Sequence, residues 1–226
     1  MSNEIHHTAI IDDRVKLGSG NVIHPYTILT GPLEIGDNNI IGPNVVIGSP
    51  GQDTRNFRYD STDCQIRIGN NNIIREFTAI QKPCYKDVTS LDDDIFLMQS
   101  VHIPHDAILE RGVVITPMVV LAGITRIMEY ANLGMGCSIH QYNVIGPYSI
   151  VATGAAIIKN VKPFLKYIPG KPISVNKYAI DKFGFGEYID EISAYVIDGK
   201  IPTSEKIGGV VERYRKYHID SGRSEY

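Results

Sequence analysis

The sequence predicts an all-β solenoid, in which short parallel strands wind into a β-helix, followed by a small α-helical extension. Three observations support this fold class: an aliphatic residue recurs at every sixth position, polar segments interrupt that rhythm twice, and the spacing becomes helical near the C-terminus. The 226 residues suit one domain with a small appendage. We expect the β-helix to occupy residues 1–172 and the helical extension to occupy residues 173–226.

The aliphatic positions form long series without a miss. The series cover residues 5–47, 68–80 and 91–157. A period of six is neither the 3.6 of a helix nor the 2 of a half-buried strand, and it is typical of a solenoid whose hexapeptides each supply one strand and one corner. Stacked coils then bury one continuous aliphatic core. Glycine often follows the aliphatic residue, as at Gly36 and Gly134, where we expect it to ease a tight corner.

The interruptions and the tail have different compositions from the coils. Residues 49–66 and 81–90 are polar and rich in turn formers, so we expect loops that leave the coil, and such loops often carry function. The rhythm ends at VKPFLKYIPGKP, residues 161–172. Helical spacing follows, and it predicts two or three short helices after about residue 176, with Ser204 as the N-cap of the last one.

Composition and charge exclude several classes of protein. The net charge of −3 provides no basic field for nucleic acid, and no apolar run approaches the roughly 20 residues that span a bilayer. The N-terminus lacks the pattern of a secretory signal. The three cysteines have no metal-ligand spacing, and their odd number fits poorly with a disulfide framework. We therefore expect a cytoplasmic protein with reduced thiols.

The 18-residue period of the coils predicts that polar residues distant in the sequence lie close together. A triangular coil takes three hexapeptides, so residues 18 apart lie above one another. His105, Gly123 and Gln141 share one such column, His140 lies in the next column, and His102 lies one corner away from His105. At the usual strand spacing these groups lie within roughly 10 Å of one another along the coil axis. The sequence therefore predicts one polar site on one edge of the prism.

The chemistry of this cluster favours proton transfer. His105 can act as a general base near neutral pH, and Asp106 can fix its tautomer if the backbone turns there. Gly123 can offer its amide to a developing oxyanion. Two other interpretations of the histidines are surface residues at coil corners and a metal site formed by His102, His105 and His140. Their spacing does not match known zinc sites, so we expect no metal.

Several segments resemble one family. QSVHIPHDA, LAG at residues 121–123 and SIHQY at residues 138–142 are similar to motifs of the UDP-N-acetylglucosamine acyltransferases of lipid A biosynthesis. The likeness extends to IGSPGQD, IREFTAIQK and VNKYAIDKFGF, and it covers about residues 5–186. The resemblance implies a left-handed parallel β-helix and a homotrimer with active sites in clefts between subunits.

The resemblance also implies roles for individual residues. His105 would be the catalytic base, Asp106 its partner, and the Gly123 amide the oxyanion donor. The residues implied in substrate binding are Gln52, Asp53, His102, His140, Gln141 and Asn176.

This chain departs from the family at informative positions. Ile124 stands where the family has a histidine that bonds a sugar hydroxyl, and an apolar Ile124 would instead pack against a methyl group. We therefore count Ile124 as a substrate-binding residue that predicts a 6-deoxy sugar. In the tail, Tyr178, Lys182 and Phe183 replace an acidic residue and an arginine pair. Residues 161–172 further resemble a stretch of coenzyme A-dependent sugar acetyltransferases, and their other interpretation is a chain exit from the last coil.

These features predict an acyltransferase for surface glycan or lipopolysaccharide synthesis. It would move an acetyl or other acyl group from a thioester of coenzyme A or acyl carrier protein onto a nucleotide-linked amino sugar. The thioester would be a co-substrate, and no bound cofactor is expected. One alternative is the lipid A enzyme itself, which acylates UDP-N-acetylglucosamine from acyl carrier protein. Another is a non-catalytic β-helix that assembles other proteins.

Overall fold

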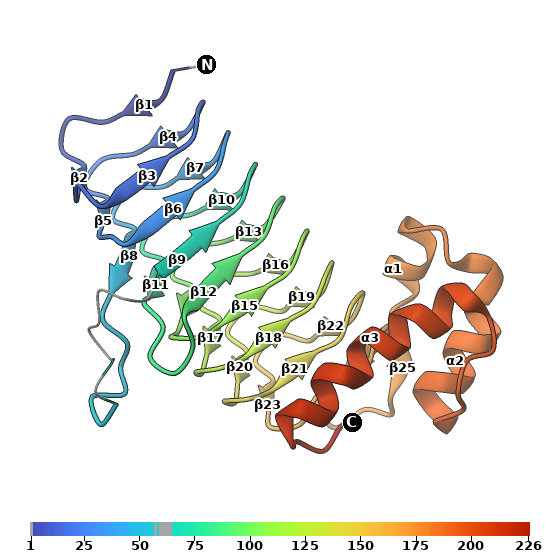
Figure 1. Cartoon of the computed structure of the whole chain (residues 1–226). Coiled ribbons are helices and arrows are strands. Elements are labelled where there is room, and N and C mark those ends of the chain that lie inside the picture. The colour runs from blue at the N-terminus through green and yellow to red at the C-terminus, as the bar shows by residue number, and fades with distance from the viewer. Residues whose placement is uncertain (1, 57, 59–64) are drawn as a thin grey trace.

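Short parallel strands wind into a solenoid, and helices close one end of it (Figure 1). The computed structural model describes residues 2–56, 58 and 65–226. The strands form three sheets, A, B and C, which are the three faces of the prism. Nearly every pair of neighbouring strands is parallel, so the predicted parallel β-helix is confirmed.

The sheets take one strand from each coil in turn. Sheet A contains β1 (Glu4–Ile5), β4 (Val22–Ile23), β7 (Ile40–Ile41), β10 (Ile73–Ile74), β13 (Phe96–Leu97), β16 (Val114–Ile115), β19 (Asn132–Leu133), β22 (Ile150–Val151), β24 (Leu165–Tyr167) and β25 (Ser174–Val175). Sheet B contains β2 (Ile10–Ile11), β5 (Ile28–Leu29), β8 (Val46–Ser49), β11 (Ala79–Gln81), β14 (His102–Ile103), β17 (Val120–Leu121), β20 (Ser138–Ile139) and β23 (Ala156–Ile157). Sheet C contains β3 (Val15–Leu17), β6 (Leu33–Ile35), β9 (Gln65–Ile68), β12 (Val88–Leu91), β15 (Ile108–Leu109), β18 (Arg126–Ile127) and β21 (Val144–Ile145).

The sixth-position aliphatic residues fill the axis of the prism. Leu29, Ile47 and Leu97 are fully buried, and most of the other positions of the series are almost as inaccessible. Strand register repeats every 18 residues, as in the pairing of Ile115 with Leu133 and of Leu133 with Val151. One face of each short strand therefore faces the core, and residues 18 apart stack as predicted.

The glycines after these aliphatic residues serve the neighbouring coil more than the corner. A Cβ on Gly36 would lie 2.7 Å from the carbonyl oxygen of Gly69, and one on Gly134 would lie 2.5 Å from the amide nitrogen of Thr153. Positive φ angles occur instead at residues such as Asn38, where φ is 57°. The prediction that glycine eases the corner was therefore wrong for Gly36 and Gly134, which allow two backbones to approach closely, whereas Gly48, with a φ of 98°, uses glycine's conformational freedom.

Both predicted loops leave the solenoid at the edge between sheets B and C (Figure 1). The first follows β8 and ends before β9, and its residues 57 and 59–64 lie outside the described part of the chain, as does Cys64. The second covers residues 82–87 and is shorter than predicted, because residues 81 and 88–90 still pair as strands. Two excursions from one edge mark that edge as different from the other two.

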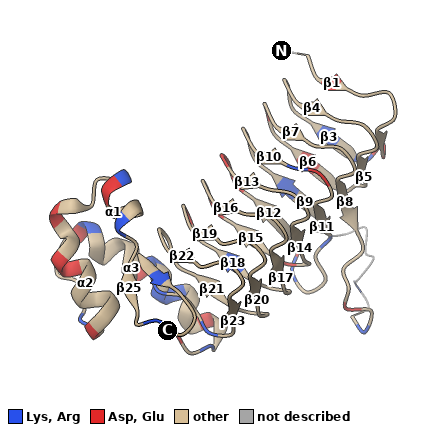
Figure 2. Cartoon of the chain, turned by 180° about the vertical axis from the view of Figure 1, so that it is seen from behind, with Lys and Arg blue, Asp and Glu red and all other residues tan. Residues whose placement is uncertain are grey.

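The tail folds into helices that pack on the last coils. They are α1 (Lys177–Lys182), the 3-10 helix η1 (Gly186–Tyr188), α2 (Ile189–Asp198) and α3 (Glu205–Ser221). Ser204 caps α3 as predicted, since its Oγ accepts a hydrogen bond from the amide of Ile207. Ile192 and Val196 belong to the same buried cluster as the coil residues. Charged residues are sparse on the coils and frequent on these helices (Figure 2).

Helix α3 is joined to sheet C by ion pairs. Arg213 contacts Glu110 at 2.9 Å and Glu129 at 3.0 Å, and Arg126 contacts Glu110 at 2.8 Å. These contacts fix the helix across the later coils. Among the described residues, no helix is long and apolar enough to cross a bilayer.

Candidate functional site

His105 lies in the corner that follows β14, at the edge from which both loops leave. Strands β14, β17 and β20 lie side by side (Figure 2), and their pairing places His105, Gly123 and Gln141 in successive coils. The amide of Ile124 donates to the carbonyl of His105, and the amide of Tyr142 donates to the carbonyl of Gly123, each at 3.1 Å. The column predicted from the 18-residue spacing is therefore confirmed.

His105 and Asp106 form a close pair. The distance between His105 Nδ1 and Asp106 Oδ2 is 2.7 Å, and the two side chains are 13% and 0% exposed. The pair forms because Asp106 has a φ of 63°, which turns the chain so that adjacent side chains meet. Since the carboxylate accepts from Nδ1, the proton of a neutral imidazole resides there and Nε2 is left with its lone pair. Nε2 can therefore accept a proton.

The second loop holds the Asp106 carboxylate. Backbone amides of residues 84–86 all donate to it, at distances from 2.7 to 3.2 Å. Burial alone would raise the pKa of Asp106, but the hydrogen bonds from His105 and from these amides together outweigh burial and lower the pKa below its ordinary value. Asp106 therefore stays ionised, and its orientation is set by a segment that the hexapeptide rhythm of the coils does not include.

Gly123 provides the space for the His105 ring. A Cβ on Gly123 would lie 2.5 Å from His105 Nε2, so only glycine lets the imidazole lie over the next coil. The Gly123 amide has no acceptor among the described residues. A backbone N–H without an acceptor and a ring nitrogen with a free lone pair thus lie on neighbouring groups, and acyl transfer needs both.

The first loop covers the pair from the other side. Gly51 packs so closely that a Cβ there would lie 3.1 Å from that of His105. Asp53 forms an ion pair with Arg55 at 2.9 Å and accepts a hydrogen bond from the Tyr85 hydroxyl. Arg55 first, and Tyr85 second, hold the pKa of Asp53 well below its usual range. The Tyr85 ring lies 5.8 Å from that of His105, so Tyr85 bridges both loops and the base. Sequence reasoning missed Tyr85, whose only signal was its place in the second loop.

The other predicted residues lie on or near the strands and the loop that meet at this edge. His102 lies on β14, where burial, and then the neighbouring His105, lower its pKa. His140 and Gln141 follow two coils later and are exposed, as is Gln52 in the first loop. Among the described residues, no group of three or more His, Cys, Asp or Glu side chains is arranged to hold a metal ion.

Ile124 and Asn176 have different surroundings. Ile124 has a φ of 63°, a strained conformation for a β-branched residue, directly beside the Gly123 amide. Asn176 is 5% exposed and caps α1, accepting from the amide of Ala179 and donating to the carbonyl of Tyr148 at 2.8 Å. Within one chain, therefore, Asn176 supports the helical tail and is not brought to the His105 column.

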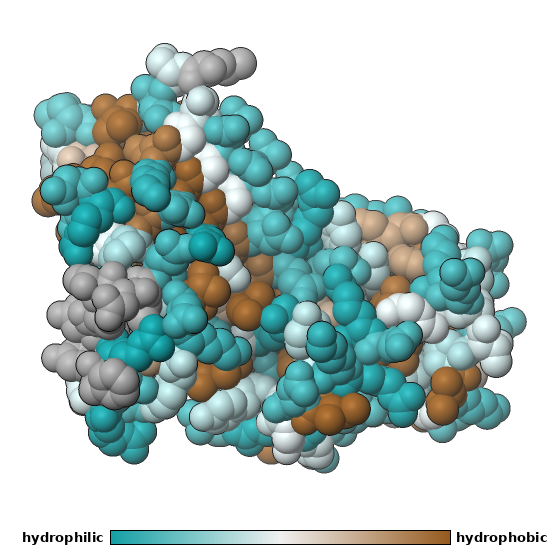
Figure 3. Space-filling model, in the orientation of Figure 1, coloured by the Kyte–Doolittle hydropathy of each residue, from teal (hydrophilic) through white to brown (hydrophobic). Residues whose placement is uncertain are grey.

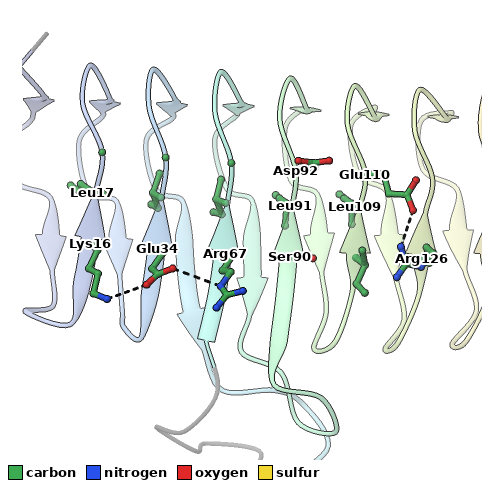
Figure 4. A pocket seen from close by; sticks show the side chains of 16 residues that line it. Lys16, Leu17, Glu34, Arg67, Ser90, Leu91, Asp92, Leu109, Glu110 and Arg126 are labelled. Carbon is green, nitrogen blue, oxygen red and sulfur yellow. Dashed lines mark hydrogen bonds and ion pairs between the residues drawn. The ribbon is translucent and has the colours of Figure 1, made fainter.

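A larger hollow lies elsewhere, on the outer face of sheet C. It has a volume of about 780 Å³ and extends from Lys16 to Arg126 (Figure 4). Several of its charges pair with one another, for example Lys16 with Glu34 at 3.1 Å and Arg126 with Glu110 at 2.8 Å, and apolar residues show between them over the early coils (Figure 3). A smaller hollow of about 230 Å³ on sheet B is lined in part by Ala122 and His140. The candidate site is at His105, because a hollow without a reactive group cannot catalyse a reaction, whereas His105 has a carboxylate partner and a neighbouring amide without an acceptor.

Known proteins share this sequence pattern and this fold. The bacterial transferase hexapeptide family (six repeats) matches residues 14–49. Enzymes named acyl-[acyl-carrier-protein]–UDP-N-acetylglucosamine O-acyltransferase from Burkholderia orbicola and Burkholderia thailandensis are 32% and 33% identical over 150 residues. The chain is similar in sequence to the UDP-N-acetylglucosamine acyltransferases. The resemblance drawn from the motifs is thereby confirmed. The alignment covers 65% of this chain and only 56% of the length of those relatives.

Solved structures of UDP-N-acetylglucosamine acyltransferases share the fold over nearly the whole chain. The Campylobacter jejuni protein superimposes with a TM-score of 0.80 at 21% identity, covering 99% of this chain and 97% of its own. The Francisella novicida protein superimposes with a TM-score of 0.65 at 26% identity, covering 98% and 93%. The helical tail therefore has a counterpart in these structures too.

Proposed function

We propose that this protein is an acyltransferase that moves an acyl group from a thioester to a nucleotide-linked amino sugar. The observation that carries the proposal is the His105–Asp106 pair lying over the unbonded amide of Gly123. In the reaction, His105 Nε2 takes the proton from the attacking sugar group as that group bonds to the thioester carbon. The Gly123 amide stabilises the oxyanion, which then collapses and expels the thiol, with the proton returned from His105.

The comparisons favour one acceptor and one donor over the others. The relatives' names specify O-acylation of UDP-N-acetylglucosamine from acyl carrier protein. We therefore put this reaction ahead of acetyl transfer from coenzyme A. A 6-deoxy amino sugar is the second candidate acceptor, and it is favoured by Ile124 alone, whose apolar side chain stands beside the Gly123 amide. If a hydroxyl is the nucleophile, the base is essential, whereas an amine that is already neutral needs it less.

We propose further that the active protein is a left-handed β-helical homotrimer. Sheet B, which borders His105, exposes large apolar side chains such as Ile10 (63%) and Val120 (49%), and Ile158 (59%) directly follows its last strand; a partner subunit would bury them. Light scattering during gel filtration should give three times the mass of the chain, and a monomer would contradict this. A cytoplasmic location stays a prediction.

A mass-shift assay tests the function. Purified protein is given UDP-N-acetylglucosamine or a 6-deoxy nucleotide sugar, together with acyl carrier protein or coenzyme A thioesters. We expect acyl transfer to at least one acceptor, and a loss of about 10²-fold or more in His105→Ala with a hydroxyl acceptor. His24→Ala, which changes an exposed histidine of an early coil, should retain full activity. Transfer to no acceptor would support the non-catalytic alternative, and full activity of His105→Ala on a hydroxyl would refute the mechanism.

A further inference from the structure

The C-terminal tail returns to the edge of the solenoid that carries the site. After α3 ends, the amide of Asn160 donates to the carbonyl of Ser224 at 2.8 Å, and the amide of Tyr226 donates to the carbonyl of Asn160 at 2.9 Å. These bonds fix the tail against the last coil. Arg223 is thereby placed with its Nη2 3.0 Å from Nδ1 of His140. Residues 83 positions apart thus meet at this edge of the solenoid.

The contact with Arg223 determines the tautomer of His140. A guanidinium has only donors, so Nδ1 of His140 must be the acceptor and the ring proton must lie on Nε2. The other contact of this nitrogen, with the carbonyl of Gln141 at 3.4 Å, would need a proton on Nδ1. The Arg223 contact is shorter and is compatible with only one position of the ring proton, so it determines the tautomer. His140 therefore presents an N–H donor at Nε2.

Arg223 keeps most of its hydrogen-bonding capacity open. No carboxylate pairs with it among the described residues, and its guanidinium carbon lies 5.9 Å from the centre of the Tyr142 ring. His140, which Arg223 contacts, lines the hollow of about 230 Å³ on sheet B, whose other lining residues are mainly apolar and include Ala122 and Ile158. An unpaired cation and an imidazole donor beside one hollow suit a ligand group that only accepts hydrogen bonds and carries negative charge.

We propose that Arg223 and His140 form a phosphate subsite of the active site. This inference rests on the proposed function, whose substrates carry phosphate in two places: the diphosphate of the nucleotide sugar, and the phosphates of the coenzyme A or phosphopantetheine donor. Either source would receive charge-assisted hydrogen bonds from Arg223 and one from His140 Nε2. The shared chemistry is the phosphate group, and the two sources differ in which substrate loses affinity when Arg223 is changed.

Titration calorimetry with UDP and with coenzyme A, each alone, tests the subsite without requiring turnover. We expect Arg223→Gln to weaken the binding of one probe about tenfold or more, and Arg223→Lys to restore part of it. Loss with UDP assigns the subsite to the acceptor, and loss with coenzyme A assigns it to the donor. Arg215→Gln, which changes an exposed arginine of the same C-terminal segment, should bind both probes as the unchanged protein does. Unchanged affinity in Arg223→Gln, or no binding of either probe by the unchanged protein, would overturn the proposal.

Spectra and melting temperatures check the structure of the subsite, and a comparison of binding with turnover separates this inference from the proposed function. Nitrogen-15 spectra of the histidine rings should show the Nε2–H form of His140, and Arg223→Gln should shift the ring toward the other tautomer. Unchanged melting temperatures would show that the tail still packs. Phosphate binding without acyl transfer would refute the proposed function and leave the subsite intact. Acyl transfer with unchanged KM values for both substrates in Arg223→Gln would refute the subsite and leave the function intact.

Discussion

Two columns of polar side chains run along different edges of the same prism. At the edge between sheets C and A, the Asn39 amide donates to Asn21 Oδ1 at 2.9 Å, and Asn39 Nδ2 donates to the carbonyl of Gly69 at 3.0 Å. The same bonding links successive coils at this edge. The asparagines of this ladder are Asn3, Asn21, Asn39 and Asn72.

The column at the edge between sheets B and C behaves differently. Its members, His105, Gly123 and Gln141, are three different residue types, and no side chain repeats from coil to coil. The buried carboxylate beside it, Asp106, depends on amides of the second loop. A repeated column links each coil to the next by the same hydrogen bond and so stabilises the coil stack, whereas an unrepeated column supported from outside the coils indicates chemistry.

The largest expected effect comes from Asp106→Asn. The amide cannot accept from His105 and three backbone donors as a carboxylate does, so His105 loses its fixed tautomer. We expect kcat to fall about 10²-fold or more and the free energy of unfolding to fall by about 1–3 kcal/mol. Asp94→Asn is the matched control, because Asp94 also has a positive φ at a corner but contacts Arg111 at the surface. Equal activity of both variants would show that Asp106 has no special role in catalysis, and the column at His105 would then differ from the asparagine ladder in composition only.

Gly123→Ala should act on the site with less effect on the coil stack. The new methyl group would collide with the His105 ring and displace it from above the Gly123 amide. We expect kcat to fall about 10²-fold, with a melting temperature close to that of the unchanged protein. Gly208→Ala is the control, because a Cβ there meets open space in α3. A fully active Gly123→Ala protein would show that the ring position is unimportant.

Asn39→Ala should lower stability and leave kcat unchanged, which is the opposite of the effect expected for Gly123→Ala. Removing this side chain leaves the buried backbone amide of Asn72 and the carbonyl of Gly69 without their partner. We expect a loss of about 1–3 kcal/mol in urea unfolding and unchanged kcat per folded molecule. Asn132→Ala, on the outer face of β19, should change stability by about 0.5 kcal/mol or less. A fall in kcat without a fall in stability would contradict a structural role for the ladder.

The smallest effect concerns the pH dependence of stability through His102. Burial, and then His105, lower the pKa of His102 below the ordinary 6.5. As pH falls below 6.5, the unfolded chain binds a proton at this residue and the folded chain does not, so stability declines until the lowered pKa is passed. His102→Gln should therefore lose less stability between pH 7.5 and 5.5 than the unchanged protein. The comparison needs melting temperatures at both pH values, and an equal loss in both proteins would contradict it.

Much of the site followed from counting alone. Because parallel coils repeat, a separation of 18 residues along the chain predicts contact, and that rule alone stacks His105 over Gly123, as the strand pairing confirms. The pairing of Asp106 with the adjacent His105 required the backbone to turn there, and the positive φ of Asp106 provides that turn. The N-cap at Ser204 followed from a local rule and is confirmed.

By itself, the sequence determined the solenoid, its stacking register and the edge on which the chemistry lies, because each depends on a repeat that can be read along the chain. Only the tertiary structure decided what surrounds that edge. The amides around Asp106, the Tyr85 bridge to Asp53 and the return of Arg223 to His140 join segments whose separation follows no period. The physical reason is that a repeat transmits geometry from one coil to the next, whereas loops and tails are positioned by packing against coils already formed.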